Sequence, residues 1–194
     1  MPDIIVIGGG MAGVSAAAAL AADAEVLLLE AEPGTGQHST ARSAAIFIRN
    51  YGNAALRALN DRAAGFFEAP DIDVEAPLLT PRGELLLATG EELDLLEEYA
   101  AGSAGLERLS AAEAERLVPI LKPGHFAGAV LEPEARDIDV DAMLQGYLRQ
   151  FRARGGQLRC KAPVSALSRE AGLWQIVAGG ETHAAPVVVN AAGA

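Results

Sequence analysis

The sequence predicts an α/β protein whose first part contains a parallel sheet. Two short apolar runs, Ile4–Ile7 and Val26–Leu29, are typical of strands that are buried on both faces. The alanine-rich segment Met11–Ala22 between them favours a helix, and three glycines at residues 8–10 separate the first strand from that helix. A strand, a glycine turn, a helix and a second strand in close succession form a βαβ unit, whose crossover is almost always right-handed and joins parallel strands.

The segment after the second strand predicts a loop, a helix and a hairpin. A long polar loop rich in Gly, Ser and Thr extends from residue 31 to about Ala44. A helical pattern then begins at Asn53 and closes near Pro70. The runs 78–80 and 84–88, separated by Pro-Arg-Gly at 81–83, predict the two strands of a hairpin.

Two capping signals predict short acidic helices in the middle of the chain. Thr89 with Glu92, and Ser110 with Glu113, have the spacing of a capping box, in which a hydroxyl and a carboxylate satisfy amides of the first turn. The segment Phe126–Leu131 is apolar and predicts the strand that follows these helices.

The last third of the chain predicts one long helix and then a series of strands. Asp139 is expected to cap a helix that continues to Arg154, with Gly155 as its terminator. Glycine pairs and turns punctuate the strands that follow, which we expect at residues 157–160, 164–168, 173–177, 182–184 and 187–190.

The elements between residues 79 and 138 interrupt the α/β pattern with mixed strands and acidic helices. We therefore expect a first domain in two segments, 1–78 and 139–194, with part of a mixed α+β domain at 79–138 between them. The first domain would combine a parallel sheet with a layer of β-hairpins.

Composition excludes several classes of function. The 194 residues carry 15 Lys and Arg against 26 Asp and Glu, a formal net charge of −11, which argues against a protein that binds nucleic acid through its phosphates. The single cysteine, Cys160, cannot form an internal disulfide or a cysteine-based metal centre, so we expect a reducing compartment, the cytoplasm. His125 and His183 lack a partner at ligand spacing, so no metal site is expected. The uncharged stretch 4–22 is read as soluble structure because glycines occupy its middle, so no transmembrane segment is expected.

The motif G-x-G-x-x-G occupies Gly8 to Gly13, between the first strand and the first helix. Such a motif binds a dinucleotide in a Rossmann-like domain: Gly8 makes the tight turn, Gly10 lets a pyrophosphate approach the backbone, and Gly13 packs the helix on the sheet. Glu30 ends the second strand, where an acid accepts hydrogen bonds from an adenosine ribose. The alternative is that these glycines only form a turn in an unrelated α/β protein.

The loop after Glu30 bears on which dinucleotide is bound. In a nicotinamide-binding domain we would expect a third helix and strand to follow promptly, and they do not. Residues 38–45 instead offer hydroxyls, a fixed cation and small side chains, which suit a diphosphate and a ribityl chain close to the backbone. An ordinary solvated loop is the alternative. The residues concerned are His38, Ser39, Thr40, Ala41, Arg42, Ser43, Ala44 and Ala45.

These residues also carry a resemblance to a known family. Pro33-Gly34, the run from His38 to Ala45 and Tyr51-Gly52 resemble the D-amino-acid oxidase-like (DAO) family of FAD-dependent amine oxidoreductases. Within the family the chain is most similar to the bacterial D-arginine dehydrogenases. The resemblance continues at residues 77–82, 137–139 and 145–149 and at the final residues 189–194, so it covers essentially the whole chain.

The resemblance implies a two-domain flavoprotein that holds FAD non-covalently in an extended conformation. It implies oxidation of a D-amino acid to an imino acid by hydride transfer from the α-carbon to flavin N5, followed by hydrolysis to a 2-oxo acid. Oxygen or a quinone-like carrier would take the electrons. Carried over by position, the cofactor-binding residues would be Gly8, Gly10, Met11, Ala12, Gly13, Glu30, Ala31, the stretch from Ser39 to Ile46, Val164, Ala192 and Gly193.

The resemblance also implies three positions at the substrate. Tyr51 matches a tyrosine at the substrate pocket, and Glu84 matches a carboxylate that receives a cationic substrate side chain. A loop anchor and an exposed hairpin charge are the respective structural alternatives. Ile46 stands where the arginine-specific enzymes have a histidine, so the resemblance supports amine oxidation without supporting D-arginine as the substrate.

The family continues beyond the point at which this sequence ends, so we expect the chain to be the amino-terminal half of an enzyme, inactive by itself. Two other readings stay open for the whole protein. One is a glycine- or sarcosine-oxidase type of amine oxidase, and the other is a non-catalytic flavin- or nucleotide-binding module. An NAD-dependent enzyme is a further alternative, which predicts a colourless protein that NAD stabilises and FAD does not.

Overall fold

The computed structural model describes residues 1–193, and Ala194, the last residue of the expected second segment, lies outside the described residues. The chain forms two compact units. The first contains residues 1–44, 70–78 and the chain from Asp139 onward, and the second contains residues 45–69 and 79–138.

A four-stranded parallel sheet forms the centre of the first unit, in the order β13-β1-β2-β9. Ile4 in β1 lies opposite Val26 in β2 and Val187 in β13. The strands are β1 (Ile4–Ile7), β2 (Val26–Leu29), β9 (Gln157–Arg159) and β13 (Val187–Asn190). The two strands that the sequence predicted as buried on both faces, β1 and β2, are the central pair.

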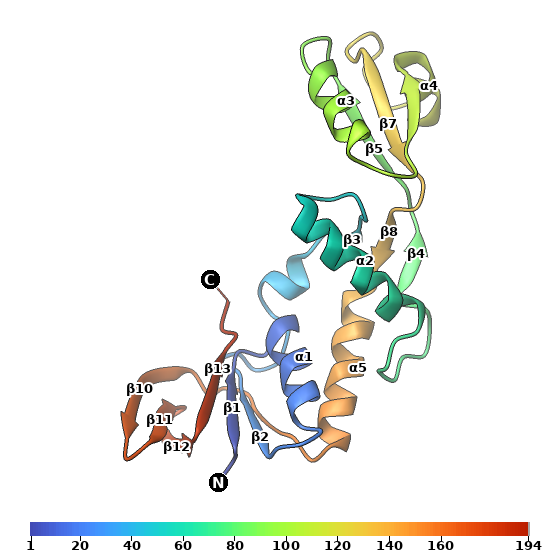
Figure 1. The fold of residues 1–194 in the computed structure, drawn as a ribbon. Helices are drawn as coiled ribbons and strands as arrows, with labels where there is room; N and C mark the ends of the chain where they lie inside the picture. Colours follow the sequence, from blue (N-terminus) through green and yellow to red (C-terminus); the bar gives the residue numbers. More distant parts are fainter. Residues whose placement is uncertain (194) are drawn as a thin grey trace. The chain divides into compact units, whose positions relative to one another are not determined.

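Helices α1 (Met11–Leu20) and α5 (Val140–Ala153) cover one face of this sheet and lie side by side (Figure 1). Val6 and Leu28 of the sheet pack against Phe151 of α5 in a fully buried cluster. The alanines of α1 allow its backbone to approach both the sheet and α5, because their side chains occupy little volume. A short 3-10 helix, η1 (Ser39–Arg42), lies in the loop that follows β2.

An antiparallel sheet covers the other face. It has the order β10-β11-β12 and consists of β10 (Val164–Glu170), β11 (Leu173–Ala178) and β12 (Glu181–Ala185). Ile5 and Leu27 point toward this layer and pack with Ile176 and Ala178. Alternate residues of β1 and β2 therefore serve two separate cores, which is why both strands are apolar throughout.

The second unit contains two three-stranded antiparallel sheets, in the orders β3-β8-β4 and β5-β7-β6. The strands are β3 (Ile46–Phe47), β4 (Leu79–Pro81), β5 (Glu84–Ala88), β6 (Glu107–Ser110), β7 (Gly128–Glu132) and β8 (Arg136–Ile138). The helices are α2 (Ala54–Glu68), α3 (Leu93–Ala101) and α4 (Ala111–Leu117). Leu96 and Ala100 of α3 pack on Ala88 and Val130 of the second sheet.

The prediction that residues 78–80 and 84–88 pair as a hairpin is wrong. β4 pairs with β8, and β5 pairs with β7. The amides of Arg82 and Gly83 both donate to the carbonyl oxygen of Ala135, at 3.2 and 2.8 Å, so the chain continues from β8 to its neighbour β7 instead of reversing. Gly83 permits this with a φ of +80°.

The two capping signals have different outcomes. Ser110 and Glu113 form the expected capping box at the start of α4. The Glu92 carboxylate accepts hydrogen bonds from the Thr89 amide and hydroxyl, at 3.0 and 2.8 Å, but the Thr89 hydroxyl caps no amide. The helix begins three residues later than this signal predicts, at Leu93, because the Thr89–Glu92 segment forms a separate turn.

The division into units also differs from the expected one for residues 45–69, which the sequence analysis placed in the first domain. The structure groups them with residues 79–138. β3 pairs with β8, and the side-chain amide of Asn50 donates to the Ala104 carbonyl while its oxygen accepts from the Ala104 amide, both at 3.0 Å. These pairings connect the two segments of the second unit.

Candidate cofactor site

The candidate site lies at the carboxyl edge of the parallel sheet in the first unit. Strands β1, β2 and β13 run in the same direction and end there together. The amide of Gly8 donates to the Leu29 carbonyl, and the amide of Ala191 donates to the Ile7 carbonyl, both at 2.8 Å. Three chain segments far apart in sequence are thus fastened to one another at the edge where open α/β sheets bind their ligands.

The glycine turn after β1 has no room for a side chain at Gly8 or Gly9. Gly8 has a φ of +107°, and a Cβ atom on it would overlap the carbonyl oxygen of Ala191. A Cβ on Gly13 would overlap the carbonyl oxygen of Gly8. A Cβ on Gly9 would lie 2.6 Å from a carboxylate oxygen of Glu30. Gly9 received no role in the sequence analysis, and its place inside the triple glycine was the signal available for it.

The amino end of α1 lies at the carboxyl edge of the parallel sheet and faces any ligand bound there. Gly10 is the N-cap residue and has no side chain to cap the helix, and the first turn contains no acidic residue. The Thr40 hydroxyl accepts a hydrogen bond from the Met11 amide at 3.0 Å. The amides of Ala12 and Gly13 belong to the same first turn, whose donors have no partner within the helix. This end therefore presents a positive partial charge that fits a diphosphate.

Glu30 is a buried acid with both oxygens in use. Its side chain is 8% exposed. One carboxylate oxygen accepts from the Gly9 amide at 2.6 Å, and the other accepts from the Glu32 amide at 2.8 Å. A carboxylate oxygen has more than one lone pair, so both oxygens can still accept hydroxyl donors such as those of a ribose. The two backbone bonds fix the orientation of the carboxylate; Ala31, which follows it, is exposed.

The loop after β2 is fastened at its start and exposed beyond that point. The Gly36 amide donates to the Gly9 carbonyl at 2.9 Å, and Thr40 holds the start of α1. His38 contacts Glu32 at 3.0 Å between Nε2 and a carboxylate oxygen. The exposed members of the predicted set are His38, Ser39, Ala41, Arg42, Ser43 and Ala44. Arg42 has no ion pair with any residue in the range 1–193, so its guanidinium is available to an anion.

Two later segments reach the same edge. The Ala162 amide donates to the Glu30 carbonyl at 2.8 Å, which places the segment leading to the half-buried Val164 alongside the end of β2. Ala192 follows β13 and donates its amide to the Asn190 side chain at 3.2 Å, and Gly193 has a φ of +84°. The first unit thus brings the predicted glycines, Glu30, the loop, Val164 and the chain end together.

Four predicted residues belong to the second unit. The Ala45 carbonyl accepts from the Ile138 amide at 2.9 Å, and Ile46 lies opposite Asp137. Tyr51 is 65% exposed. Glu84 begins β5 and lies opposite the buried Glu132. Glu132 is not predictable from the sequence, because a glutamate inside a short strand gives no sign of burial until its strand partner is known.

The pKa values of Glu84 and of Cys160 are both raised. Burial raises the pKa of Glu84, the charge of Glu132 adds to that effect, and Arg82 opposes it. Burial also raises the pKa of the Cys160 thiol, the charge of Glu30 adds to the effect, and Arg152 opposes it.

The described part of the chain contains neither a cluster of metal-ligating side chains nor a helix suited to crossing a membrane. Residues 1–193 contain no group of three His, Cys, Asp or Glu side chains placed to hold a metal ion. No helix in this range combines the length and the apolar character that crossing a membrane requires.

Comparisons with solved structures show the same fold at low sequence identity. Glycine oxidase from Geobacillus kaustophilus matches with a TM-score of 0.83 and 22% identity, over 100% of this chain and 55% of that one. FAD-bound L-α-glycerophosphate oxidase from Mycoplasma pneumoniae matches with a TM-score of 0.84 and 16% identity, over 99% of this chain and 54% of that one. L-proline dehydrogenase from P. horikoshii matches with a TM-score of 0.80 and 21% identity, over 99% of this chain and 53% of that one. The chain spans about half the length of these structures.

A family model covers almost the entire sequence. The model described as "FAD dependent oxidoreductase", DAO, matches residues 3–194. The uncapped start of α1, the turn without side chains and the oriented Glu30 carboxylate fit the adenosine diphosphate part of FAD, the cofactor of this family. The chain belongs to the DAO family of FAD-dependent oxidoreductases.

Proposed function

We propose that the first unit binds the adenosine diphosphate portion of FAD non-covalently at the edge formed by β1, β2 and β13. The observation that carries this proposal is the pair of hydrogen bonds that fixes Glu30 beside the uncapped amino end of α1. The first-turn amides of Ala12 and Gly13 bind the diphosphate beside Met11, whose own amide donates to the Thr40 hydroxyl, and Glu30 with Ala31 binds the adenosine.

The remaining predicted cofactor residues extend the proposed site along FAD. Ser39 to Ile46 follow the stretch from the diphosphate to the flavin, with the free guanidinium of Arg42 available to a phosphate. Val164 contacts the adenine through its backbone, and Ala192 and Gly193 contact the cofactor from the end of β13. The exposure of most of the loop, and the anchoring of Thr40 to Met11, support this assignment.

We propose that the whole protein oxidises a D-amino acid or a related amine. When bound, FAD would supply a two-electron acceptor for a hydride from the substrate α-carbon. The resulting imino acid is hydrolysed by water to a 2-oxo acid and ammonia. Tyr51, Glu84 and Ile46 are the proposed substrate-binding residues on this chain, and a substrate that arrives as the neutral amine requires no base from them.

Glycine or sarcosine is the second candidate substrate. Two of the similar structures are glycine oxidases, one with 22% and one with 18% identity, and this similarity supports an achiral amine as an alternative. D-Arginine is the third candidate, and Ile46 in place of a histidine argues against it. The proposed electron acceptor is oxygen or a quinone-like carrier, and the proposed compartment is the cytoplasm.

Anaerobic substrate reduction tests the reaction. The protein, both as this chain and as the full product of its gene, is loaded with FAD and mixed without oxygen with D-amino acids, their L-enantiomers, glycine and sarcosine. The proposal expects loss of the oxidised flavin absorbance with one or more D-amino acids and none with their enantiomers. Reduction by glycine or sarcosine alone selects the second candidate. A full-length flavoprotein that no amine reduces, although dithionite reduces it, contradicts amine oxidation.

A further inference from the structure

The second unit contains a buried acid that the proposed FAD site does not use. Glu132 in β7 is 2% exposed, and its Oε2 atom has no hydrogen-bond partner among the described residues. Antiparallel pairing places Glu84 of β5 directly opposite Glu132. Leu86 and Val130, the next pair on the same face, belong to the core under α3. The two carboxyl groups therefore share the face that α3 covers, within reach of each other.

The surroundings of this pair raise the cost of a second negative charge. Tyr99 of α3 interacts with both acids. Burial raises the pKa of Tyr99, and the charges of Glu132 and Glu84 and a hydrogen bond with Glu132 add to the shift, against an opposing effect of Arg57. Two carboxylates that share a desolvated site cannot both ionise without a counter-charge.

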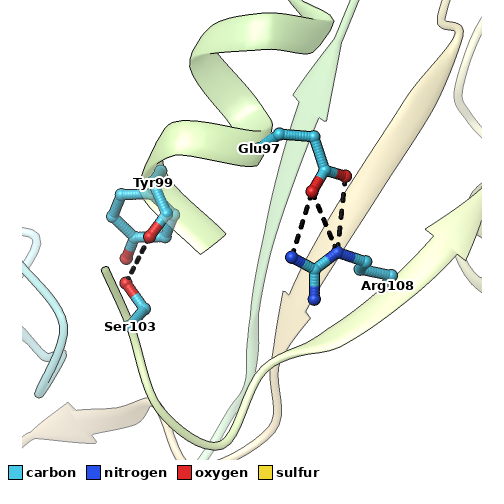
Figure 2. Close-up of polar contacts among 4 residues, drawn as sticks. All are labelled: Glu97, Tyr99, Ser103 and Arg108. Carbon is cyan, nitrogen blue, oxygen red and sulfur yellow. Dashed lines mark hydrogen bonds and ion pairs between the residues drawn. The ribbon is translucent and has the colours of Figure 1, made fainter. Parts of the chain in front are cut away.

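Three arginines of the second unit have partners of their own, and Arg82 still lowers the pKa of Glu84 against the larger effects of burial and Glu132. Arg108, which lies opposite Val130, makes three hydrogen bonds of 3.0 to 3.3 Å to Glu97 (Figure 2). Arg82 pairs with Asp137 at 2.6 Å. Arg57 donates to the carbonyl oxygens of Gly52 and Gly102 and lies 5.7 Å from the centre of the Tyr99 ring.

The position of α3 over the pair is itself fixed. Figure 2 shows the Ser103 hydroxyl donating to the Tyr99 carbonyl oxygen, a bond of 2.7 Å that closes the end of the helix. The Glu97–Arg108 pair connects the same helix to β6. The Glu97–Arg108 pair therefore opposes displacement of α3 from the sheet.

We propose that Glu84 and Glu132 share one proton at neutral pH and form a carboxyl–carboxylate pair with a single negative charge. The proton lies between the Glu84 carboxyl group and the unpartnered Oε2 of Glu132, which it satisfies. The pair keeps one negative charge, so this protonation is compatible with the proposed substrate-binding role of Glu84, and it does not depend on FAD.

Carbon-13 NMR of the glutamate carboxyl carbons tests the proposal on the chain. The Glu84 signal should titrate above the ordinary glutamate range, as burial and the Glu132 charge require. In Glu132→Gln the Glu84 midpoint should move down toward that range. Glu107→Gln, an exposed glutamate of β6 in the same sheet, is the matched control and should leave the midpoint unchanged. A Glu84 midpoint that Glu132→Gln does not lower overturns the proposal.

A second variant keeps the proposal testable if Glu132→Gln does not fold. Protonation is favoured in the folded state, so the hydrogen-exchange protection of β7 should fall as the pH rises above the ordinary glutamate range. Glu84→Gln keeps a donor opposite Glu132 without a titrating proton, and should remove this fall. An unchanged fall in Glu84→Gln overturns the proposal. A loss of β7 protection when tetramethylammonium replaces sodium also overturns the proposal, because Oε2 of Glu132 would then bind a cation and not a proton.

Discussion

At the scale of single residues, the candidate site depends on places where a side chain is absent. Gly13 packs directly on the Gly8 carbonyl oxygen, and Gly8 packs on the carbonyl of Ala191. These contacts bring the end of β13 against the turn after β1. The Glu30 carboxylate then orients the Gly9 amide, so backbone and side chain together define the shape of the site.

Gly13→Ala should destabilise the first unit by about 1–3 kcal/mol, the usual cost of overpacking. The added methyl group would meet backbone atoms, including the Gly8 carbonyl carbon at 3.0 Å, and neither partner can move without displacing the turn. Chemical unfolding followed by the fluorescence of Trp174, which lies in the first unit, measures the change.

Gly34→Ala is the matched control for this prediction. Its Cβ would meet only a side-chain nitrogen of Gln37 at 3.5 Å, an ordinary contact, and its φ is not positive. We expect a change within about 0.5 kcal/mol, as for surface substitutions in general. A Gly13→Ala variant as stable as Gly34→Ala would contradict the packing described for the turn.

At the scale of elements, signals within one short segment predicted structure correctly, whereas strands that depend on distant partners were missed. The βαβ unit was predicted correctly because its apolar runs and glycines all lie within one short segment, and the Ser110–Glu113 box was confirmed for the same reason. Strands β3, β6 and β8 were missed. They have only two to four residues, and their pairing partners are distant in sequence.

Asn53→Ala should weaken α2 by about 1 kcal/mol, the typical cost of losing an N-cap side chain. The Asn53 oxygen accepts from the amides of Ala55 and Leu56, both at 3.1 Å, and alanine leaves both donors to water. Hydrogen exchange of the α2 amides measures the loss. Asn53→Asp keeps the acceptor and should retain protection; equal loss in both variants would mean that the cap does not stabilise the helix.

At the scale of the whole molecule, the sequence predicted the class of fold. The α/β fold with a parallel sheet and an antiparallel layer is confirmed. The partners of Glu30 were not predictable, because bonds to the amides of Gly9 and Glu32 depend on the path of the loop after β2. The place of residues 45–69 in the second unit likewise depends on the long-range pairs of β3 and Asn50.

The central claim is that the glycine turn and the fixed Glu30 carboxylate bind the adenosine diphosphate part of FAD. Calorimetric titration of the chain with FAD, repeated with Glu30→Gln and with the nearby control Glu32→Gln, tests it most directly. We expect the wild-type chain to bind FAD saturably and Glu30→Gln to bind it about 10- to 100-fold more weakly, since a hydrogen bond to a charged group contributes roughly 1.5–3 kcal/mol. The affinity of Glu32→Gln for FAD should stay close to the wild-type value. FAD binding of equal strength in wild type and Glu30→Gln, or binding of NAD in place of FAD, would contradict the account.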